Sequence, residues 1–330
     1  MPKDEFEWIQ QHTPERHSHP GVIEGIGDDA AVYAAEEGFD EILCVDTMVE
    51  EVHFKKQTMS AYDTGYKALA VNISDIAAMG GIPVYYIVSI AVPSSWTDEE
   101  LQDVYNGMGA LAGEYHMDMI GGDTVSSGTG LVISVTAHGR VEKGRHLVRR
   151  NARPGDIVFV TNPTGRSAAG LEWLLEHGRE SACPQPFQTL TAYHRNPCPR
   201  VKEGRVIAGS APSASLNDIS DGLASEANEI AEASGVHLQL NKQDIPVAGE
   251  LKEEFPEDTY WDWIFYGGED FELIGTVREK DWPLLQQNMK QEGLSLYDIG
   301  KVKEGDSLVT LLDGNGEQRL PKKGYNHFQS

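Results

Sequence analysis

Strand-like apolar runs alternate with helix-like runs from one end of the chain to the other, and this alternation restricts the fold to the α/β or α+β classes. Residues 60–79 place apolar side chains three and four positions apart, which predicts a long helix that ends at Gly80-Gly81. Residues 85–92 have the length and composition of a buried strand. Thr97 and Glu100 have the spacing of a capping box, so a second helix is expected to begin there.

The length of the chain predicts two domains. It has 330 residues, about twice the usual domain length of ~150. The segment Arg153-Pro154-Gly155-Asp156 is typical of a turn, and a new strand-like run follows it directly. We therefore predict an N-terminal domain over residues 1–152 and a C-terminal domain over residues 153–330.

Two segments are predicted to lie outside regular elements. Gly121-Gly122-Asp123-Thr124 is expected to form a glycine-rich turn between strands at residues 117–120 and 131–141. Residues 181–199 contain four prolines and two cysteines, which indicates an irregular connection on the surface.

The charge balance excludes several classes of partner. Asp and Glu total 52 against 27 Lys and Arg, giving a formal net charge of −25, which argues against nucleic acid or an anionic membrane. The three cysteines lack C-x-x-C spacing, so neither a disulfide framework nor a zinc site is predicted. The N-terminus lacks a signal-peptide profile and no apolar run reaches the ~18 residues of a membrane span. A cytoplasmic protein is therefore expected.

Familiar phosphate-binding motifs do not occur in the sequence: it has neither a P-loop nor an H-R-D catalytic loop. Residues 25–30 match G-x-G-x-x-A, but a dinucleotide fingerprint needs a strand before it and a helix after it. Here His19-Pro20-Gly21 precedes the match and a strand-like Ala-Val-Tyr follows it, so we interpret the match as accidental.

The chain offers instead a series of aspartates that we expect on turns beside strands and small residues. They occur in Gly27-Asp28-Asp29, Asp46-Thr47, Ser74-Asp75, Gly121-Gly122-Asp123-Thr124, Asp218-Ile219-Ser220-Asp221-Gly222 and Gly267-Gly268-Glu269-Asp270. The preference of aspartate for turns and helix N-caps explains each one alone. Their repeated pairing with glycine, which lets backbone approach a ligand closely, favours a binding role. Oxygen ligands without His or Cys select hard cations, and several Mg²⁺ ions would bring two phosphate groups together in an acidic site.

Taken in order, these motifs resemble those of the thiamine-monophosphate kinase family. The matching segments, between about residue 5 and residue 328, are Gly25-Ile26-Gly27-Asp28-Asp29-Ala30, Val45-Asp46-Thr47, His53-Phe54, residues 66–80, residues 120–124, residues 218–223, residues 267–270 and residues 323–328. The resemblance implies a two-domain fold like that of aminoimidazole ribonucleotide synthetase. In that fold the N-terminal α/β domain forms a barrel with its copy in a homodimer, and a C-terminal α/β domain follows.

The resemblance also implies an enzyme that phosphorylates thiamine monophosphate to thiamine diphosphate, the last step of thiamine diphosphate biosynthesis, with ATP as co-substrate and several Mg²⁺ ions. The implied Mg²⁺ ligands are Asp29, Asp46, Asp75, Asp123, Asp218 and Asp221, with Asp28 adjacent. The implied ATP contacts are Tyr105, Gly122, Asp123, Arg149 and Ser220. The implied contacts to thiamine phosphate are His53, Glu269 and Tyr325, with Glu269 at the aminopyrimidine and Tyr325 stacked on a ring.

Structural explanations stand beside these roles. His53 is explained equally by a backbone partner, Tyr105 by the core face of its helix, Tyr325 by an anchor for the C-terminal tail, and Asp221 by an N-cap.

Two points in the motifs stay open. Arg145 and Arg150 lie beside Arg149, and one of the three is expected to reach a phosphate. The family often carries hydroxyl residues where this chain has Cys44-Val45, so a ligand there would have to be a backbone carbonyl.

The expected chemistry is direct in-line transfer without a general base or a covalent intermediate. The acceptor is a phosphate monoester with a second pKa of about 6, so it is already largely dianionic at neutral pH. One alternative is another ATP-using synthetase of the same superfamily. A second alternative is a non-catalytic acidic protein that binds divalent ions.

Overall fold

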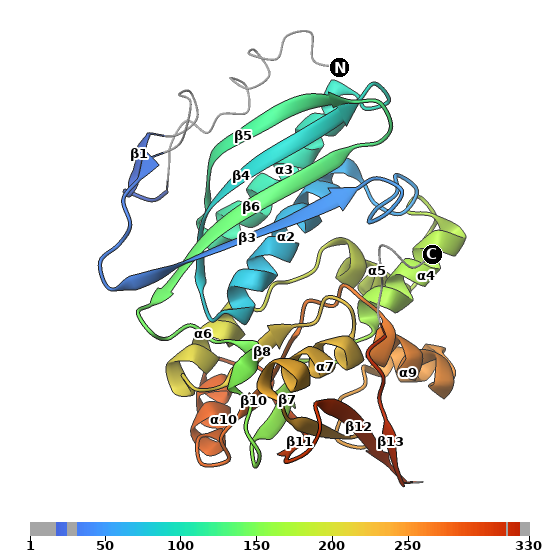
Figure 1. The fold of residues 1–330 in the computed structure, drawn as a ribbon. Coiled ribbons are helices and arrows are strands. Elements are labelled where there is room, and N and C mark those ends of the chain that lie inside the picture. The colour runs from blue at the N-terminus through green and yellow to red at the C-terminus, as the bar shows by residue number, and fades with distance from the viewer. Residues whose placement is uncertain (1–17, 25–31, 315, 324–330) are drawn as a thin grey trace. The chain divides into compact units, whose positions relative to one another are not determined.

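The computed structural model describes residues 18–24, 32–314 and 316–323, and the chain divides into two compact units (Figure 1). Unit 1 comprises residues 1–76, 81–144 and 177–181, and unit 2 comprises residues 77–80, 145–176 and 182–330. Within the described ranges, none of the helices has both the length and the apolar character needed to cross a membrane.

Unit 1 contains a four-stranded sheet in the order β3-β6-β4-β5 and a two-stranded hairpin. The strands of the sheet are β3 (Phe39–Val49), β4 (Ile82–Pro93), β5 (Asp118–Ser127) and β6 (Val132–Glu142). Strand β6 is antiparallel to both of its neighbours, whereas β4 and β5 are parallel. The hairpin pairs β1 (Val22–Glu24) with β2 (Val32–Tyr33), so the G-x-G-x-x-A match has a strand on each side and no helix after it.

Helices α2 (Ala61–Ala78) and α3 (Asp98–Tyr115) cover one face of this sheet (Figure 1). The predicted capping box is confirmed, because the side chains of Thr97 and Glu100 each accept a hydrogen bond from the other residue's backbone N–H. The opposite face of the sheet exposes apolar side chains, including Leu43 at 73% and Val45 at 60%.

Unit 2 contains a seven-stranded sheet in the order β13-β12-β9-β11-β7-β10-β8. Its strands are β7 (Ile157–Val160), β8 (Ser215–Asp218), β9 (His237–Asn241), β10 (Leu273–Val277), β11 (Tyr297–Lys303), β12 (Leu308–Asp313) and β13 (Gly316–Arg319). Strands β9 and β12 are parallel, and the other neighbouring pairs are antiparallel.

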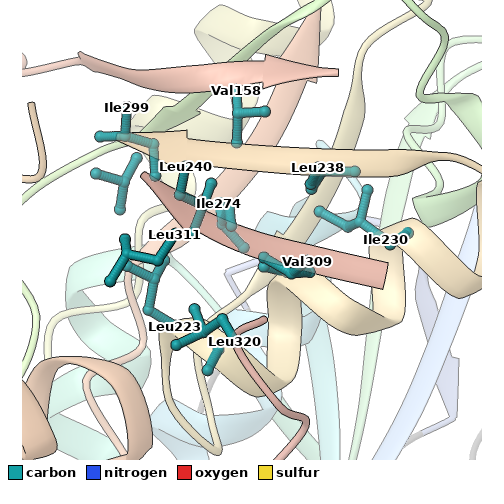
Figure 2. Close-up of a cluster of buried hydrophobic side chains, with 14 of the residues drawn as sticks. Val158, Leu223, Ile230, Leu238, Leu240, Ile274, Ile299, Val309, Leu311 and Leu320 are labelled. Carbon is teal, nitrogen blue, oxygen red and sulfur yellow. The ribbon is translucent and has the colours of Figure 1, made fainter. Parts of the chain in front are cut away.

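Helices pack on both faces of the seven-stranded sheet. The helical elements of unit 2 are η1 (Arg149–Asn151), α4 (Arg166–His177), α5 (Phe187–Arg195), α6 (Val201–Ser210), α7 (Leu223–Ser234), α8 (Gly249–Glu254), α9 (Glu257–Tyr266) and α10 (Trp282–Gln291). Val158 of β7 joins a buried cluster with α7, shown in Figure 2, whereas the next residue, Phe159, joins a cluster with α6 and α10. This alternation along β7 is typical of a strand buried on both faces.

Two predictions about irregular segments are wrong. Residues 121–124 lie inside β5. Glycine is needed at position 122 because the neighbouring strand is close: a Cβ there would come within 2.4 Å of the carbonyl oxygen of Val88. Residues 181–199 contain helix α5, which begins directly after Pro186. Proline is tolerated at the start of a helix, since the first N–H groups have no partner inside it.

Candidate functional site

Asp46 and Asp75 come together in unit 1, inside a strand and a helix; the helix is the one predicted over residues 60–79. Asp46 is inside β3, and Asp75 is in the last turn of α2. The Asp75 side chain is a hydrogen-bond partner of the Asp46 carboxyl group. Burial raises the pKa of Asp46, and the hydrogen bond with Asp75 and the charge of His53 offset this only in part.

His53 lies in the tight turn after β3, where Glu51 has a φ of 67°. The backbone N–H of Val49 donates to Nδ1 of His53 at 3.0 Å. Since Nδ1 accepts this bond, the ring carries a proton on Nε2, which makes that atom a hydrogen-bond donor.

Cys44 and Val45, where the chain departs from the family pattern, face opposite sides of the sheet. The Cys44 thiol donates to the backbone oxygen of Asn72 in α2 at 3.4 Å. Burial, together with the charges of Asp75 and Asp46, raises the pKa of Cys44, so the group is a neutral thiol and a poor metal ligand. The Val45 side chain is on the exposed face.

Asp123 and Gly122 belong to different rows of the sheet. Residues that pair across neighbouring strands form rows that run across the sheet. The row that contains Asp46 of β3 reaches β5 at Gly122. The next row contains Thr47 of β3, Ser89 of β4 and Asp123 of β5. Because successive residues of a strand point to opposite faces, Asp123 is on the exposed face. It is also three strand spacings, or ~14 Å, from β3. The described part of unit 1 therefore does not bring Asp123 to the Asp46–Asp75 pair.

Tyr105 is half-buried on α3, on the helix-covered side of the sheet. It lies close to Tyr86 of β4. Burial is the main cause that raises the pKa of Tyr86, and Tyr105 adds a smaller increase. Tyr105 is thus near the sheet. Tyr86 and Cys44 are both paired with Ala137, one from each side of β6.

In unit 2, three of the predicted residues sit on one turn. Asp218 is the last residue of β8, and Ser220 and Asp221 precede α7. The N-cap of α7 is Gly222, with a φ of 104°, so the N-cap explanation for Asp221 is wrong. A side chain at Gly222 would clash, because its Cβ would come within 2.7 Å of the carbonyl oxygen of Phe265. We call residues 218–221 the aspartate turn.

Glu269 lies beside the aspartate turn. Its backbone N–H donates to the carbonyl oxygen of Ser220 at 2.7 Å, and Glu269 has a φ of 68°. Its carboxylate is 3.4 Å from Nδ1 of His194, which also contacts the hydroxyl of Ser167 at 3.1 Å. The next residue, Asp270, is buried and accepts hydrogen bonds from the backbone N–H groups of Gly165 and Ser167. Unit 2 thus holds Glu269 next to Asp218, Ser220 and Asp221.

Two buried residues that we did not predict, Asn217 and Glu226, lie under the aspartate turn. Arg149 donates from Nε to the side-chain oxygen of Asn217 at 2.8 Å, and Asn217 in turn donates to Glu226. Burial, followed by the nearby Glu229 and Asp218 carboxylates, raises the pKa of Glu226 to about 9. The sequence does hold a signal for Glu226, because it lies three residues after Leu223 and four before Ile230, on the apolar face of α7.

The donor chemistry of these acidic groups fits divalent cations. The shared hydrogen bond of Asp46 and Asp75 and the crowded carboxylates around Asp218 are arrangements that a hard cation relieves. The residues within the described ranges do not form a complete three-ligand cluster in either unit. Asp28, Asp29 and Tyr325 lie outside those ranges.

A cavity of about 510 Å³ also lies in unit 2, and it is lined mainly by residues of α5 and the segments on either side of it. None of the predicted site residues is among its lining residues.

Comparison with known proteins first defines the class. The family model "AIR synthase related protein, N-terminal domain" matches residues 27–141, and "AIR synthase related protein, C-terminal domain" matches residues 153–313. With two α/β units and aspartates at strand and helix ends, the fold is that of an AIR synthase-related protein.

The relatives narrow this class. The chain is 50% identical to the thiamine-monophosphate kinase of Bacillus subtilis (strain 168), covering 99% of this chain and 100% of that protein. The crystal structure of thiamine-monophosphate kinase from Stenotrophomonas maltophilia K279a matches with a TM-score of 0.83 and 30% identity, over 92% of this chain and 94% of that one. A structure described as AaThiL complexed with AMPPCP and TMP matches with a TM-score of 0.77 and 31% identity, over 89% of each chain. The chain belongs to the thiamine-monophosphate kinase family.

Proposed function

We propose that this protein transfers the γ-phosphate of ATP to thiamine monophosphate and so makes thiamine diphosphate. The observation that carries the proposal is the 50% identity to the Bacillus subtilis thiamine-monophosphate kinase over the full length of both chains. The AaThiL relative, described as a complex with AMPPCP and TMP, supports a site for a nucleotide and a second ligand.

The proposed cofactor is Mg²⁺, as several ions, with Asp29, Asp46, Asp75, Asp123, Asp218 and Asp221 as proposed ligands; Asp123, on the exposed face of the sheet, would hold a different ion from Asp46 and Asp75. The closeness of the Asp46 and Asp75 side chains supports this, because a divalent cation between two carboxylates offsets the charge of both. Bound Mg²⁺ would neutralise the negative charge between the two phosphate groups.

The proposed ATP contacts are Tyr105, Gly122, Asp123, Arg149 and Ser220. Arg149 is favoured over Arg145 and Arg150, because its guanidinium is hydrogen-bonded to Asn217, the residue before Asp218. That bond uses Nε, and the other nitrogens carry the donors that suit a phosphate group.

The proposed contacts to thiamine monophosphate are His53, Glu269 and Tyr325. With its proton on Nε2, His53 would donate to an anionic oxygen of the substrate. The Glu269 carboxylate would accept from the amino group of the aminopyrimidine, and its backbone is held in place by Ser220.

These residues would act by binding and orienting the two reactants. The acceptor phosphate has a second pKa of about 6, so no side chain has to remove a proton from it at neutral pH. The rate then depends on positioning and on charge neutralisation, and the transfer is proposed to be direct and in line.

A homodimer is proposed to form through the exposed face of the four-stranded sheet. Leu43 and Val45 of β3, Ile87 of β4 and Val125 of β5 are all exposed apolar side chains on this sheet. Exposed apolar side chains gathered on one face of a sheet are typical of a protein interface, and a second copy of the chain would cover them symmetrically.

A cytoplasmic location is also proposed. Cys44, Cys183 and Cys198 are all free thiols, which suits a reducing compartment.

The decisive assay offers the purified protein ATP, Mg²⁺ and thiamine monophosphate, and measures thiamine diphosphate by chromatography. We expect product only when all three are present, and none when EDTA removes the metal. Thiamine is the control acceptor and should give no phosphorylated product. Failure of the complete mixture to yield thiamine diphosphate would overturn the proposal.

A further inference from the structure

Asn217 and Glu226 form a buried pair directly under the aspartate turn. Each side chain is only 2% exposed, and the Asn217 amide donates to one carboxylate oxygen of Glu226. The other oxygen of Glu226 accepts from the backbone N–H of Asp221 at 3.2 Å and from the Ser220 hydroxyl at 3.4 Å. One carboxyl group therefore holds the end of β8 and both polar residues of the turn that follows it.

The pair also reaches the arginine that we propose as a nucleotide contact. The Asn217 side-chain oxygen accepts from Nε of Arg149 at 2.8 Å. The orientation of the amide is fixed by these two bonds, because its oxygen must face Arg149 and its nitrogen must face Glu226. Arg149 also forms an ion pair with Glu229 at 3.2 Å, and its backbone oxygen accepts from the hydroxyls of Ser215 and Ser234.

We infer that Asn217 and Glu226 are positioning residues for the nucleotide: through one hydrogen-bonded chain they fix Arg149 on one side and Ser220 and Asp221 on the other. The inference rests on the proposed function, since that proposal gives Arg149, Ser220 and Asp221 their roles. Neither Asn217 nor Glu226 is proposed to touch the nucleotide.

A purely structural role for the pair makes a different prediction. If Glu226 only stabilised the first turn of α7, its loss would lower the free energy of unfolding without a selective effect on one substrate. A positioning role predicts weaker binding of the nucleotide while the binding of thiamine monophosphate is preserved.

The inference can be tested by exchanging the amide and the carboxyl group between positions 217 and 226. In Glu226→Gln only one of the two acceptor oxygens remains, so the amide nitrogen must face a donor, either the Asn217 amide or the backbone N–H of Asp221. In Asn217→Asp, two carboxyl groups face each other and the amide donor toward Glu226 is lost. The double variant Asn217→Asp/Glu226→Gln restores one donor and one acceptor in reversed order, and the carboxylate introduced at position 217 would still accept from Arg149. Glu232→Gln is the control, because Glu232 lies on the same helix and pairs with Lys322 at 3.0 Å, away from Asn217 and Glu226.

The measurement is the dissociation constant of AMPPCP in the presence of Mg²⁺, by calorimetry, together with the KM values for ATP and thiamine monophosphate and the thermal unfolding of each variant. We expect each single variant to weaken AMPPCP binding and raise the KM for ATP about tenfold, a loss typical of one buried hydrogen bond. The double variant should return to within about threefold of wild type, and the KM for thiamine monophosphate should change less than about twofold. Glu232→Gln should match wild type.

The inference is overturned if the folded single variants bind AMPPCP like Glu232→Gln, if both substrates are weakened equally, or if the two losses add in the double variant. The binding assay also separates this inference from the proposed function. Wild-type protein that binds AMPPCP with Mg²⁺ but makes no thiamine diphosphate would remove the proposed function and leave the pair's effect on nucleotide binding measurable.

Discussion

Asp75 faces Asp46 from the last turn of α2, and its substitution is expected to have a large effect on activity with a small effect on folding. Asp75→Asn replaces a carboxylate by an amide, which is a poor ligand for Mg²⁺. We expect phosphate transfer to fall at least about a hundredfold. The free energy of unfolding without metal should change by less than about 1 kcal/mol, because the variant also removes one of two crowded acidic groups. Turnover and thermal unfolding measure the two effects.

Asp103→Asn, on the exposed face of α3, is the matched control for Asp75→Asn and should leave turnover unchanged. A folded Asp75→Asn variant with near-normal turnover would remove Asp75 from the proposed metal site.

Arg200 and Glu272 form a buried ion pair in unit 2 whose loss should lower stability. Nε of Arg200 donates to Glu272 at 2.9 Å, and the Glu272 side chain is only 1% exposed. Glu272 also accepts from the hydroxyl of Thr161. Glu272→Ala leaves a buried guanidinium without its main partner, so we expect a loss of about 3–5 kcal/mol in the free energy of unfolding, measured with urea.

The control for Glu272→Ala is Glu257→Ala, which removes an exposed carboxylate that pairs with Lys242 at 3.3 Å. Exposed pairs contribute about 0–1 kcal/mol, so this variant should stay close to wild type. Equal losses in the two variants would contradict the special role of the buried pair.

Residue types and spacing predicted part of the candidate site but not the residues that support it. Asp75 and Asp46 each sit in a short motif, and the periodicity that predicted a helix over residues 60–79 also placed Asp75 in the correct element. Glu226 was missed, because an isolated glutamate in a helix is usually solvated. Asn217 was missed because its role depends on Arg149, which is 68 residues away in the chain. Hydrogen bonds over such separations leave no local pattern.

Helices α2 and α3 cross at two glycines, and this contact gives a prediction for whole elements. A Cβ on Gly107 of α3 would lie 2.0 Å from the carbonyl oxygen of Tyr62, and one on Gly65 of α2 would lie 1.8 Å from that of Val104. Gly107→Ala must therefore push the two helices apart, and we expect a loss of about 2–4 kcal/mol in the free energy of unfolding.

Gly109 supplies the opposite case on the same helix, because a Cβ there would meet nothing within 4 Å. Gly109→Ala should stabilise the protein by about 0.5–1 kcal/mol, since alanine favours the helix over glycine. Urea unfolding of the two variants tests both signs. A stabilising Gly107→Ala would show that the helices do not cross at this distance.

At the scale of elements, local signals predicted boundaries better than they predicted pairing. Thr97 and Glu100 fixed the start of α3, because a capping box involves only neighbouring residues. The turn predicted at Gly122 was wrong, because the sequence does not distinguish a glycine required by a close neighbouring strand from a glycine in a turn. The face on which Asp123 lies depends on register between β4 and β5, with an irregularity between Tyr86 and Ile87, and no local pattern specifies that.

Two domains were predicted from the length of the chain and the turn at residues 153–156, whereas the exposed apolar face is visible only once the sheet is formed. In β3, Ile42, Cys44 and Asp46 alternate with Leu43 and Val45, and only the second set is exposed. A short apolar run in a sequence does not reveal whether one or both of its faces are buried. The exposed set is therefore the feature from which an assembly can be argued.

Val45→Glu tests the proposed dimer at the scale of the whole molecule. Val45 is 60% exposed on the open face of β3, between Leu43 and Thr47. If two copies pack through this face, the variant places a carboxylate from each copy in an apolar interface, where desolvation of the charge opposes association. We expect light scattering to give twice the mass of the chain for wild type and the mass of a single chain for Val45→Glu at micromolar concentration. Leu284→Glu, at an exposed leucine of α10 in the other unit, is the control and should stay dimeric. A Val45→Glu variant with the wild-type mass would place the contact between copies elsewhere, and a monomeric wild type would rule the dimer out.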